Sequence, residues 1–226
     1  MKIIAIIISI AWSISLYGQS FKSDLDRMYQ QYEGKENLYV EMQNSVFENG
    51  TQKHNAKTKI YKKGGSFHYK MGDQSMLIND KYLVVVDHKR KNMSYDIWSA
   101  HQAKQLANMS VPLTDAILAK YPVIEYKGEK NGLRHYSLQN EKLQMSHVDV
   151  FFNTKTGFMD KMIQRYNPKL VKGDIYMEMV FKKVSTNPSF DANAFSEKQY
   201  LTIDGKTATA ASAYKKYALR ASTNLR

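Results

Sequence analysis

Strict two-residue alternation of apolar and polar side chains is the feature that most constrains the fold of this chain. In Asp174–Val184, one set of alternate side chains is Ile175, Met177, Met179 and Phe181, and the other is Tyr176, Glu178, Val180 and Lys182. This period is typical of a β-strand with one buried face. Met is unbranched and polarizable, so a Met-lined surface can repack around irregular apolar shapes. The face either packs a closed core or holds an apolar ligand.

Short segments of the same kind, joined by polar turns, extend back to residue 38. Asn49-Gly50, Asn79-Asp80 and Asn131-Gly132 are tight-turn signals between such segments. The expected strands are Leu38–Phe47, Ala56–Lys63, Ser66–Met71, Gln74–Ile78, Tyr82–Asp87, Asn92–Trp98, Val123–Tyr126, Leu133–Leu138, Ser146–Phe152, Phe158–Tyr166 and Asp174–Val184. Even spacing predicts an antiparallel meander, and hence a mainly β protein built as a half-open antiparallel β-barrel or curved sheet.

Helices are expected at few places. Leu25, Met28, Tyr29 and Tyr32 recur at spacings of three and four, which predicts an N-terminal helix over Ser23–Tyr32. Ser99–Ala107 and Leu113–Lys120 are expected to be short lid helices or irregular segments. After Ser185 the alternation ends, and the tail over Thr207–Leu219 fits either a final helix or an edge strand.

The N-terminus has the pattern of a signal peptide. Lys2 is followed by the uncharged stretch Ile3–Leu16, which is short for a membrane span of about 20 residues. Gly18 and Ser20 are small residues suited to cleavage, either before Gln19 or after Ser20. We expect an exported, periplasmic protein, although an uncleaved anchor is the alternative. The expected organisation is a signal peptide over 1–18, a β domain over 19–186, and a C-terminal extension over 187–226 packed on or flanking that domain.

Charge and composition limit the classes of binding partner that the protein can have. The net charge is +12 and there is no Cys, which rules out disulfides and thiolate metal sites. Ten Lys or Arg lie in Thr51–Lys91 against three acids, so a basic face could meet an anionic membrane surface or an acidic envelope protein. The alternative is a solvated surface that only aids solubility. No module for nucleic acid is recognisable.

Candidate chemistry is sparse. No Gly-x-Ser-x-Gly, Walker or dinucleotide-binding motif is present, so we expect no enzymatic activity and no cofactor. The six His show no close metal-ligand spacing, so no metal site is expected. His68 and His147 alternate out of phase with their apolar neighbours, which predicts surface positions for both.

A Met-rich and aromatic face is therefore the candidate ligand-binding site, as an apolar cavity. Its members follow the alternation within each expected strand: Met42, Ile60, Phe67, Tyr69, Met71, Met76, Val84, Val86, Met93, Ile97, Val148, Val150, Phe152, Met177, Met179 and Phe181. A sheet of about eight strands that closes on itself encloses an interior that is either filled or able to hold one small ligand. Each residue alone also fits an ordinary packed core.

The layout resembles the outer-membrane lipoprotein carrier family (LolA and LolB) over roughly Phe21–Val184. The resemblance rests on a signal peptide, a first helix ending at Tyr32, the hairpin stretch Lys59–Lys70, the turn Asn79–Leu83, and the late hairpin Val148–Gly157 followed by Met162-Ile163. It implies a half-open antiparallel barrel with helices as a lid over an apolar cavity, and a lipoprotein's acyl chains as ligand. The hypothesis is a carrier or binding protein for lipid or lipoprotein acyl chains. The alternative is a non-enzymatic structural or adapter subunit of a secretion or motility apparatus.

Overall fold

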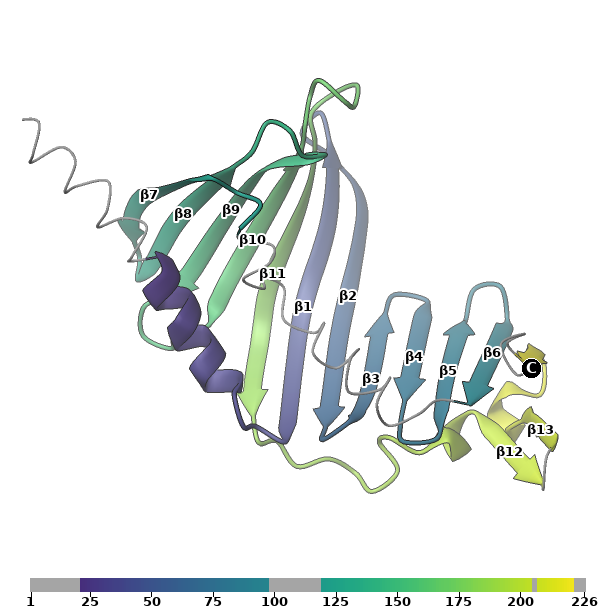
Figure 1. Cartoon of the computed structure of the whole chain (residues 1–226). Coiled ribbons are helices and arrows are strands. Elements are labelled where there is room, and N and C mark those ends of the chain that lie inside the picture. The colour runs from purple at the N-terminus through teal and green to yellow at the C-terminus, as the bar shows by residue number, and fades with distance from the viewer. Residues whose placement is uncertain (1–20, 98–118, 205–206, 222–226) are drawn as a thin grey trace, which may run out of the picture. The chain divides into compact units, whose positions relative to one another are not determined.

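The computed structural model describes residues 21–97, 119–204 and 207–221 (Figure 1). One helix covers residues 21–32, in place of the expected Ser23–Tyr32. The lid helices expected over Ser99–Ala107 and Leu113–Lys120 lie, except for the last two residues, outside the described residues. The other regular elements are β-strands and two short 3₁₀ helices, so the expectation of a mainly β fold with an N-terminal helix is confirmed.

The strands follow the expected segments closely. They are β1 Asn37–Glu48, β2 Thr51–Lys63, β3 Ser66–Met71, β4 Gln74–Ile78, β5 Tyr82–Asp87, β6 Asn92–Ile97, β7 Val123–Lys130, β8 Leu133–Gln139, β9 Met145–Asn153, β10 Met159–Tyr166, β11 Ile175–Thr186, β12 Leu201–Asp204, β13 Thr207–Ala210 and β14 Ala218–Ala221. Two short 3₁₀ helices, Glu197–Gln199 and Ser212–Tyr214, lie in the C-terminal segment. The tail over Thr207–Leu219 therefore contains short strands and a 3₁₀ turn, and β14 lies at the edge of the sheet, in agreement with the edge-strand alternative.

Two predicted boundaries were clearly wrong, and one of them is the end of the strand expected over Val123–Tyr126, because β7 continues to Lys130. The return strand after Asn49-Gly50 was expected to begin near Ala56, but β2 begins at Thr51. Asn49 has a φ of 50° and Gly50 a φ of 76°, which is the pair of positive angles that a two-residue hairpin turn requires. The turn therefore connects β1 and β2 directly. The first residues of β2 are polar and show no apolar alternation, but they still belong to the strand that pairs with β1.

Twelve strands form a single open sheet in the order β14-β6-β5-β4-β3-β2-β1-β11-β10-β9-β8-β7 (Figure 1). β14 pairs with β6 in parallel, and the pairs from β2 to β6 and from β7 to β11 are antiparallel. β12 and β13 form a separate hairpin. By contacts the chain divides into two compact units, and the long strands β1, β2 and β11 each contribute one part to either unit.

Of the described residues, the first unit contains 21–34, 43–55 and 119–182. Its N-terminal helix packs against one face of β8 and β9, where the ring of Phe21 meets Tyr136 at 5.0 Å and Phe152 at 5.9 Å between centroids. Leu25 and Met28 are fully buried beside them. The helical face expected from the three-and-four spacing is therefore the one that packs.

Of the described residues, the second unit contains 35–42, 56–97, 183–204 and 207–221. Its core is a cluster of buried residues from β4, β5, β6 and the C-terminal segment: Leu77, Val84, Val86, Met93, Tyr200 and Leu201. Half-buried aromatic residues, among them Phe195, Tyr214 and Tyr217, pack against this cluster. The C-terminal segment thus covers one face of β3–β6 and completes the core of this unit.

Candidate functional site

The strand register of the first unit gathers one set of candidate residues on a single face. Val150 pairs with Tyr136 on β8 and with Met162 on β10, and Met162 in turn pairs with Met179 on β11. Val148 pairs with Leu138 and Gln164, and Gln164 pairs with Met177. Because directly paired residues point to the same side of a sheet, Val148, Val150, Phe152, Met177, Met179 and Phe181 share the face on which the helix packs.

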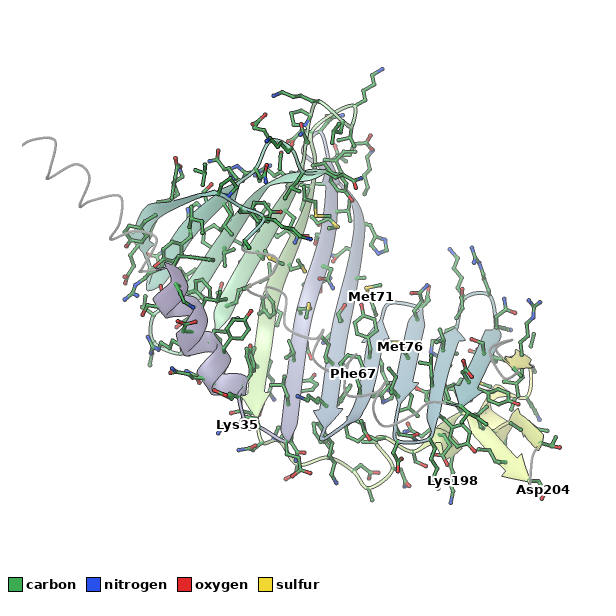
Figure 2. All side chains as sticks on the ribbon, viewed as in Figure 1. Lys35, Phe67, Met71, Met76, Lys198 and Asp204 are labelled. Carbon is green, nitrogen blue, oxygen red and sulfur yellow. The ribbon has the colours of Figure 1, made fainter. Side chains whose placement is uncertain are left out.

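The second unit also gathers candidate residues on one face. Tyr69 pairs with Ile60 on β2 and with Met76 on β4, and Met76 pairs with Val85 on β5. Phe67 pairs with Ile78, and Met71 belongs to the same alternation of β3. Figure 2 labels Phe67 and Met71 on β3 and Met76 on β4. We call this the apolar face of the second unit.

Met42 belongs to the same apolar face. The rings of Tyr39 and Tyr61 meet at 5.1 Å, so these two tyrosines share the opposite side of β1 and β2. By alternation, Leu38, Val40 and Met42 on β1 then point to the side of Ile60.

Four candidates are not part of this face, namely Val84, Val86, Met93 and Ile97. The expectation was that one Met-rich face runs through all strands. Val84 pairs with Leu77 and Tyr95, and Val86 with Ser75 and Met93, all on the other side of the sheet. Ile97 pairs with Tyr82 on that side and is 61% exposed. The physical reason is that β5 carries apolar side chains on both sides, because the C-terminal segment buries the second side.

Exposure separates the candidates that could meet a ligand from those that only pack. Met42, Ile60, Phe67, Val148, Val150 and Phe152 are buried. Half-buried side chains remain in both units: Tyr69, Met71 and Met76 in the second, and Met177, Met179 and Phe181 in the first. Burial raises the pKa of the Tyr69 phenol, whose hydroxyl contacts Met71 Sδ at 2.9 Å. Each set of three residues is the candidate apolar ligand surface of its own unit.

The N-terminal helix is fixed to the first unit by a polar anchor that the sequence did not reveal. Arg134 Nη1 donates to Asp24 Oδ1 at 2.8 Å, and the Tyr136 hydroxyl donates to Asp24 Oδ2 at 2.7 Å. Asp24 and Tyr136 are buried, so this is a charge-assisted contact shielded from water. Arg27 and Gln31 further donate to the carbonyls of Thr154 and Thr156 in the β9–β10 turn.

Two buried methionines of β10 were also missed. Met159 pairs with Phe152 and Met162 with Val150, although their sequence separation is odd. An irregularity between Met159 and Lys161 shifts the register by one residue and brings both to the same face. Simple alternation cannot reveal this, because a bulge reverses the parity of the strand.

His68 was expected at the surface, but it is 3% exposed. Its Nδ1 lies 3.1 Å from the carbonyl of Ala194 and its Nε2 lies 2.8 Å from the hydroxyl of Tyr200. If Nδ1–H donates to the carbonyl, Nε2 accepts from Tyr200. Burial, and to a lesser extent the charge of Lys70, lowers the pKa of His68 to about 4. Burial raises the pKa of Tyr200 to about 12.

A second histidine continues this network. The side chains of Ser75 and Tyr200 form a hydrogen bond. Ser75 Oγ also lies 2.9 Å from His88 Nε2. His88 Nδ1 lies 3.2 Å from the hydroxyl of Tyr217. The network therefore runs from Ala194 to Tyr217 and joins the C-terminal segment to β3, β4 and the β5–β6 turn.

On the other face of the first unit, His147 makes contacts that superficially resemble a catalytic triad. Ser137 Oγ and Asp149 Oδ1 each lie 3.2 Å from the same atom, Nε2 of His147, and Asp149 also bonds His135 at 2.8 Å. A triad needs the hydroxyl and the carboxylate on different ring nitrogens. Among the described residues, no group of three His, Cys, Asp or Glu is arranged to hold a metal ion.

Two surface hollows lie away from the apolar faces. One of about 370 Å³ is lined by the β7–β8 hairpin with His135, Phe151 and Lys161, and one of about 420 Å³ lies along Lys22, Asp26 and Gln30 of the helix. Within the described part of the chain, no helix is long and apolar enough to cross a membrane.

Comparison with known proteins gives likenesses of structure only. Neither a protein-family model nor a curated protein matches the sequence. An uncharacterized conserved protein from Thermus thermophilus has a TM-score of 0.50 at 6% identity, over 90% of this chain and 99% of its own. A LolA superfamily protein from Nitrosomonas europaea has a TM-score of 0.35 at 10% identity, over 79% of this chain and 98% of its own. The lipoprotein LppX from Mycobacterium tuberculosis has a TM-score of 0.38 at 9% identity, over 74% of this chain and 96% of its own. The Thermus thermophilus protein, which matches over nearly the whole of both chains, shows a likeness of fold alone.

Proposed function

We propose that the protein is a non-enzymatic carrier or binding protein for lipid or lipoprotein acyl chains. The observation that supports this is the half-buried apolar surface in each unit: Tyr69, Met71 and Met76 in one, and Met177, Met179 and Phe181 in the other. A face that only formed a core would bury these side chains as fully as it buries Val150 and Phe152.

The chemistry of this surface suits a flexible chain. Thioethers adapt to irregular apolar shapes, and each methylene removed from water contributes about 0.8 kcal/mol. A dozen methylenes give roughly 10 kcal/mol before the cost of ordering the chain, which leaves useful affinity. Asp24, Arg134 and Tyr136 would keep the helix fixed beside the ligand surface in the first unit.

The place of action follows from the N-terminal segment. Lys2, the uncharged stretch Ile3–Leu16 and the small residues Gly18 and Ser20 support export with cleavage before Gln19 or after Ser20. The protein would then carry its ligand in the periplasm.

The alternative of a structural or adapter subunit rests on the basic surface and on the C-terminal extension. Tyr200 and Leu201 of that extension belong to the core of the second unit. Packing of the extension is therefore explained by the fold of this unit and does not by itself favour a protein partner. The carrier is the function that the residues support better.

Native mass spectrometry of the exported protein, followed by organic extraction, tests the proposal. We expect co-purified lipid or fatty acid, and a reduced amount with Met179→Gln. Val180→Gln is the matched control, because Val180 is the next residue of β11 and pairs with Lys161 on the opposite face. Protein free of lipid that also fails to bind a fluorescent fatty acid would contradict the proposal.

A further inference from the structure

A basic, tyrosine-bearing patch lies on β1–β3, on the side opposite to the apolar face of the second unit, and includes Lys183 of β11. We call it the β1–β3 basic patch, and its members are Tyr39, Glu41, Lys57, Lys59, Tyr61, Lys70 and Lys183. All seven belong to the second unit. Lys57, Lys70 and Lys183 are exposed, and Lys59 and both tyrosines are half-buried.

Two lysines of the patch are placed directly opposite each other. Lys59 on β2 pairs with Lys70 on β3 in the strand register. Like charges at directly opposed positions destabilise a sheet. Partial burial of the Lys70 side chain and, to a lesser extent, the positive charge of Lys59 lower the pKa of Lys70. The fold therefore holds two ammonium groups together at a cost to stability.

The patch has too few acids to balance these charges. Glu41 is its single carboxylate, and it is occupied by Lys57 Nζ at 2.6 Å and by the Tyr39 hydroxyl at 2.7 Å. The bond from Lys57 lowers the pKa of Glu41, so it is ionised at neutral pH. Of the ion pairs within 4.0 Å in the described residues, none involves Lys59, Lys70 or Lys183.

Aromatic rings lie between the cations. Tyr39 and Tyr61 contact each other at 5.1 Å between centroids, and the ring of Tyr61 also contacts Phe190 of the C-terminal segment at 6.0 Å. Lys70 Nζ lies 6.0 Å from the ring of Tyr61, and Lys183 Nζ lies 5.8 Å from the ring of Tyr39. Amphipathic tyrosines next to long lysine side chains are suited to the interface between water and lipid headgroups.

We propose that the β1–β3 basic patch docks the protein on an anionic phospholipid bilayer. The cations are spread in two dimensions: Lys57 and Lys59 follow each other along β2 at about 6.6 Å, and Lys70 faces Lys59 one strand away at about 4.8 Å. Such an array matches a plane of lipid phosphates. An acidic peptide would present its charges along a line and leave part of the array unmatched. The inference is independent of any ligand on the apolar face.

Sedimentation of the full chain with lipid vesicles tests the proposal. We expect strong binding to phosphatidylcholine vesicles that contain phosphatidylglycerol, weak binding to pure phosphatidylcholine, and loss of the difference at high salt. The triple variant Lys59→Gln, Lys70→Gln, Lys183→Gln should bind the anionic vesicles at least about tenfold more weakly, because each lysine near the surface contributes about a fivefold factor.

The matched control removes the same charge from the other unit. Lys142, Lys155 and Lys172 are exposed, and their replacement by Gln should leave vesicle binding nearly unchanged. The apolar stretch Ile3–Leu16 is common to all variants and does not affect the comparison. Equal losses in both triple variants would overturn the proposal, as would binding to polyglutamate without binding to anionic vesicles.

A second measurement separates docking from folding. Because Lys70 faces Lys59, Lys70→Gln alone should unfold at equal or higher urea concentration than the native protein while binding anionic vesicles more weakly. If vesicle binding falls only in variants that are also destabilised, the patch is not the docking surface.

Discussion

At the residue scale, Asp24 determines how the helix is held in the first unit. It accepts hydrogen bonds from Arg134 and Tyr136, and its side chain is 9% exposed. Asp24→Asn keeps the shape but leaves the guanidinium of Arg134 without its charged partner. Because Arg134 keeps about a third of its side chain in water, we expect a loss of about 2 kcal/mol in the free energy of unfolding, measured in urea.

Asp26 on the same helix is the control for this prediction. It pairs with Lys22 at 3.0 Å, and both side chains are largely exposed. Asp26→Asn should therefore change the free energy of unfolding by less than about 0.5 kcal/mol. Equal effects of the two substitutions would show that the buried anchor does not hold the helix.

His68 gives the protein a pH dependence of known sign. The folded state binds a proton on His68 only near pH 4, whereas the unfolded chain binds one near 6.5. The contribution of neutral His68 to the free energy of unfolding is fully present above pH 6.5. It is lost as the pH falls toward 4, by up to about 3 kcal/mol. Urea unfolding of the native protein and of His68→Gln between pH 7 and pH 4 measures the difference, which should shrink with acidity. A constant difference would contradict the assignment.

At the scale of elements, β14 protects the edge of the sheet. It pairs in parallel with β6 from Ala218 to Ala221, and the amide of Ala218 donates to the carbonyl of Lys91 at 2.9 Å. A chain ending at Ala211 loses this strand and also Tyr214, Tyr217 and Leu219, which pack on the core of the second unit. We expect lower stability and association through the exposed edge of β6, seen by size exclusion with light scattering.

The control for this truncation ends the chain at Ala221 and keeps β14. That protein should remain as stable and as little associated as the full chain. If the chain ending at Ala211 behaves in the same way, β14 has no protective role. The comparison also shows why removal of the whole extension is a poor test for a partner, since Tyr200 and Leu201 are part of the core.

The sequence predicted the positions of the strands well, but it did not predict which side of each strand is buried. The reasons are physical. Turn residues such as Asn49, Gly50 and Asn131 have positive φ, a local property that the sequence states directly. Which side of a strand is buried depends on what covers it. In β5, Leu83 and Val85 lie on one side and Val84 and Val86 on the other, so alternation alone could not choose between them.

At the scale of the whole molecule, the long-range partners of polar residues could not be foreseen. Asp24 meets Arg134, and His68 meets Tyr200, across more than 100 positions of sequence. The half-buried apolar residues Tyr69, Met71, Met76, Met177, Met179 and Phe181 were all named from alternation, and their role as a ligand surface stays a prediction. A repeated period within a strand can be read locally, whereas a contact between distant elements cannot.

Ligand binding should appear in the stability of the whole chain. A ligand at a hundred times its Kd stabilises the folded state by about 2.7 kcal/mol, which corresponds to a rise in Tm of roughly 5–10 °C for a protein of this size. We expect such a rise with oleate, a much smaller one with the double variant Met76→Gln, Met179→Gln, and a full one with Val180→Gln. The variant Lys59→Gln, Lys70→Gln should keep the full rise, because both lysines lie on the side of β2 and β3 that is opposite to the apolar face of the second unit. An unchanged Tm of the native protein in saturating oleate would rule out the carrier function while leaving the docking surface to be judged by vesicle binding alone.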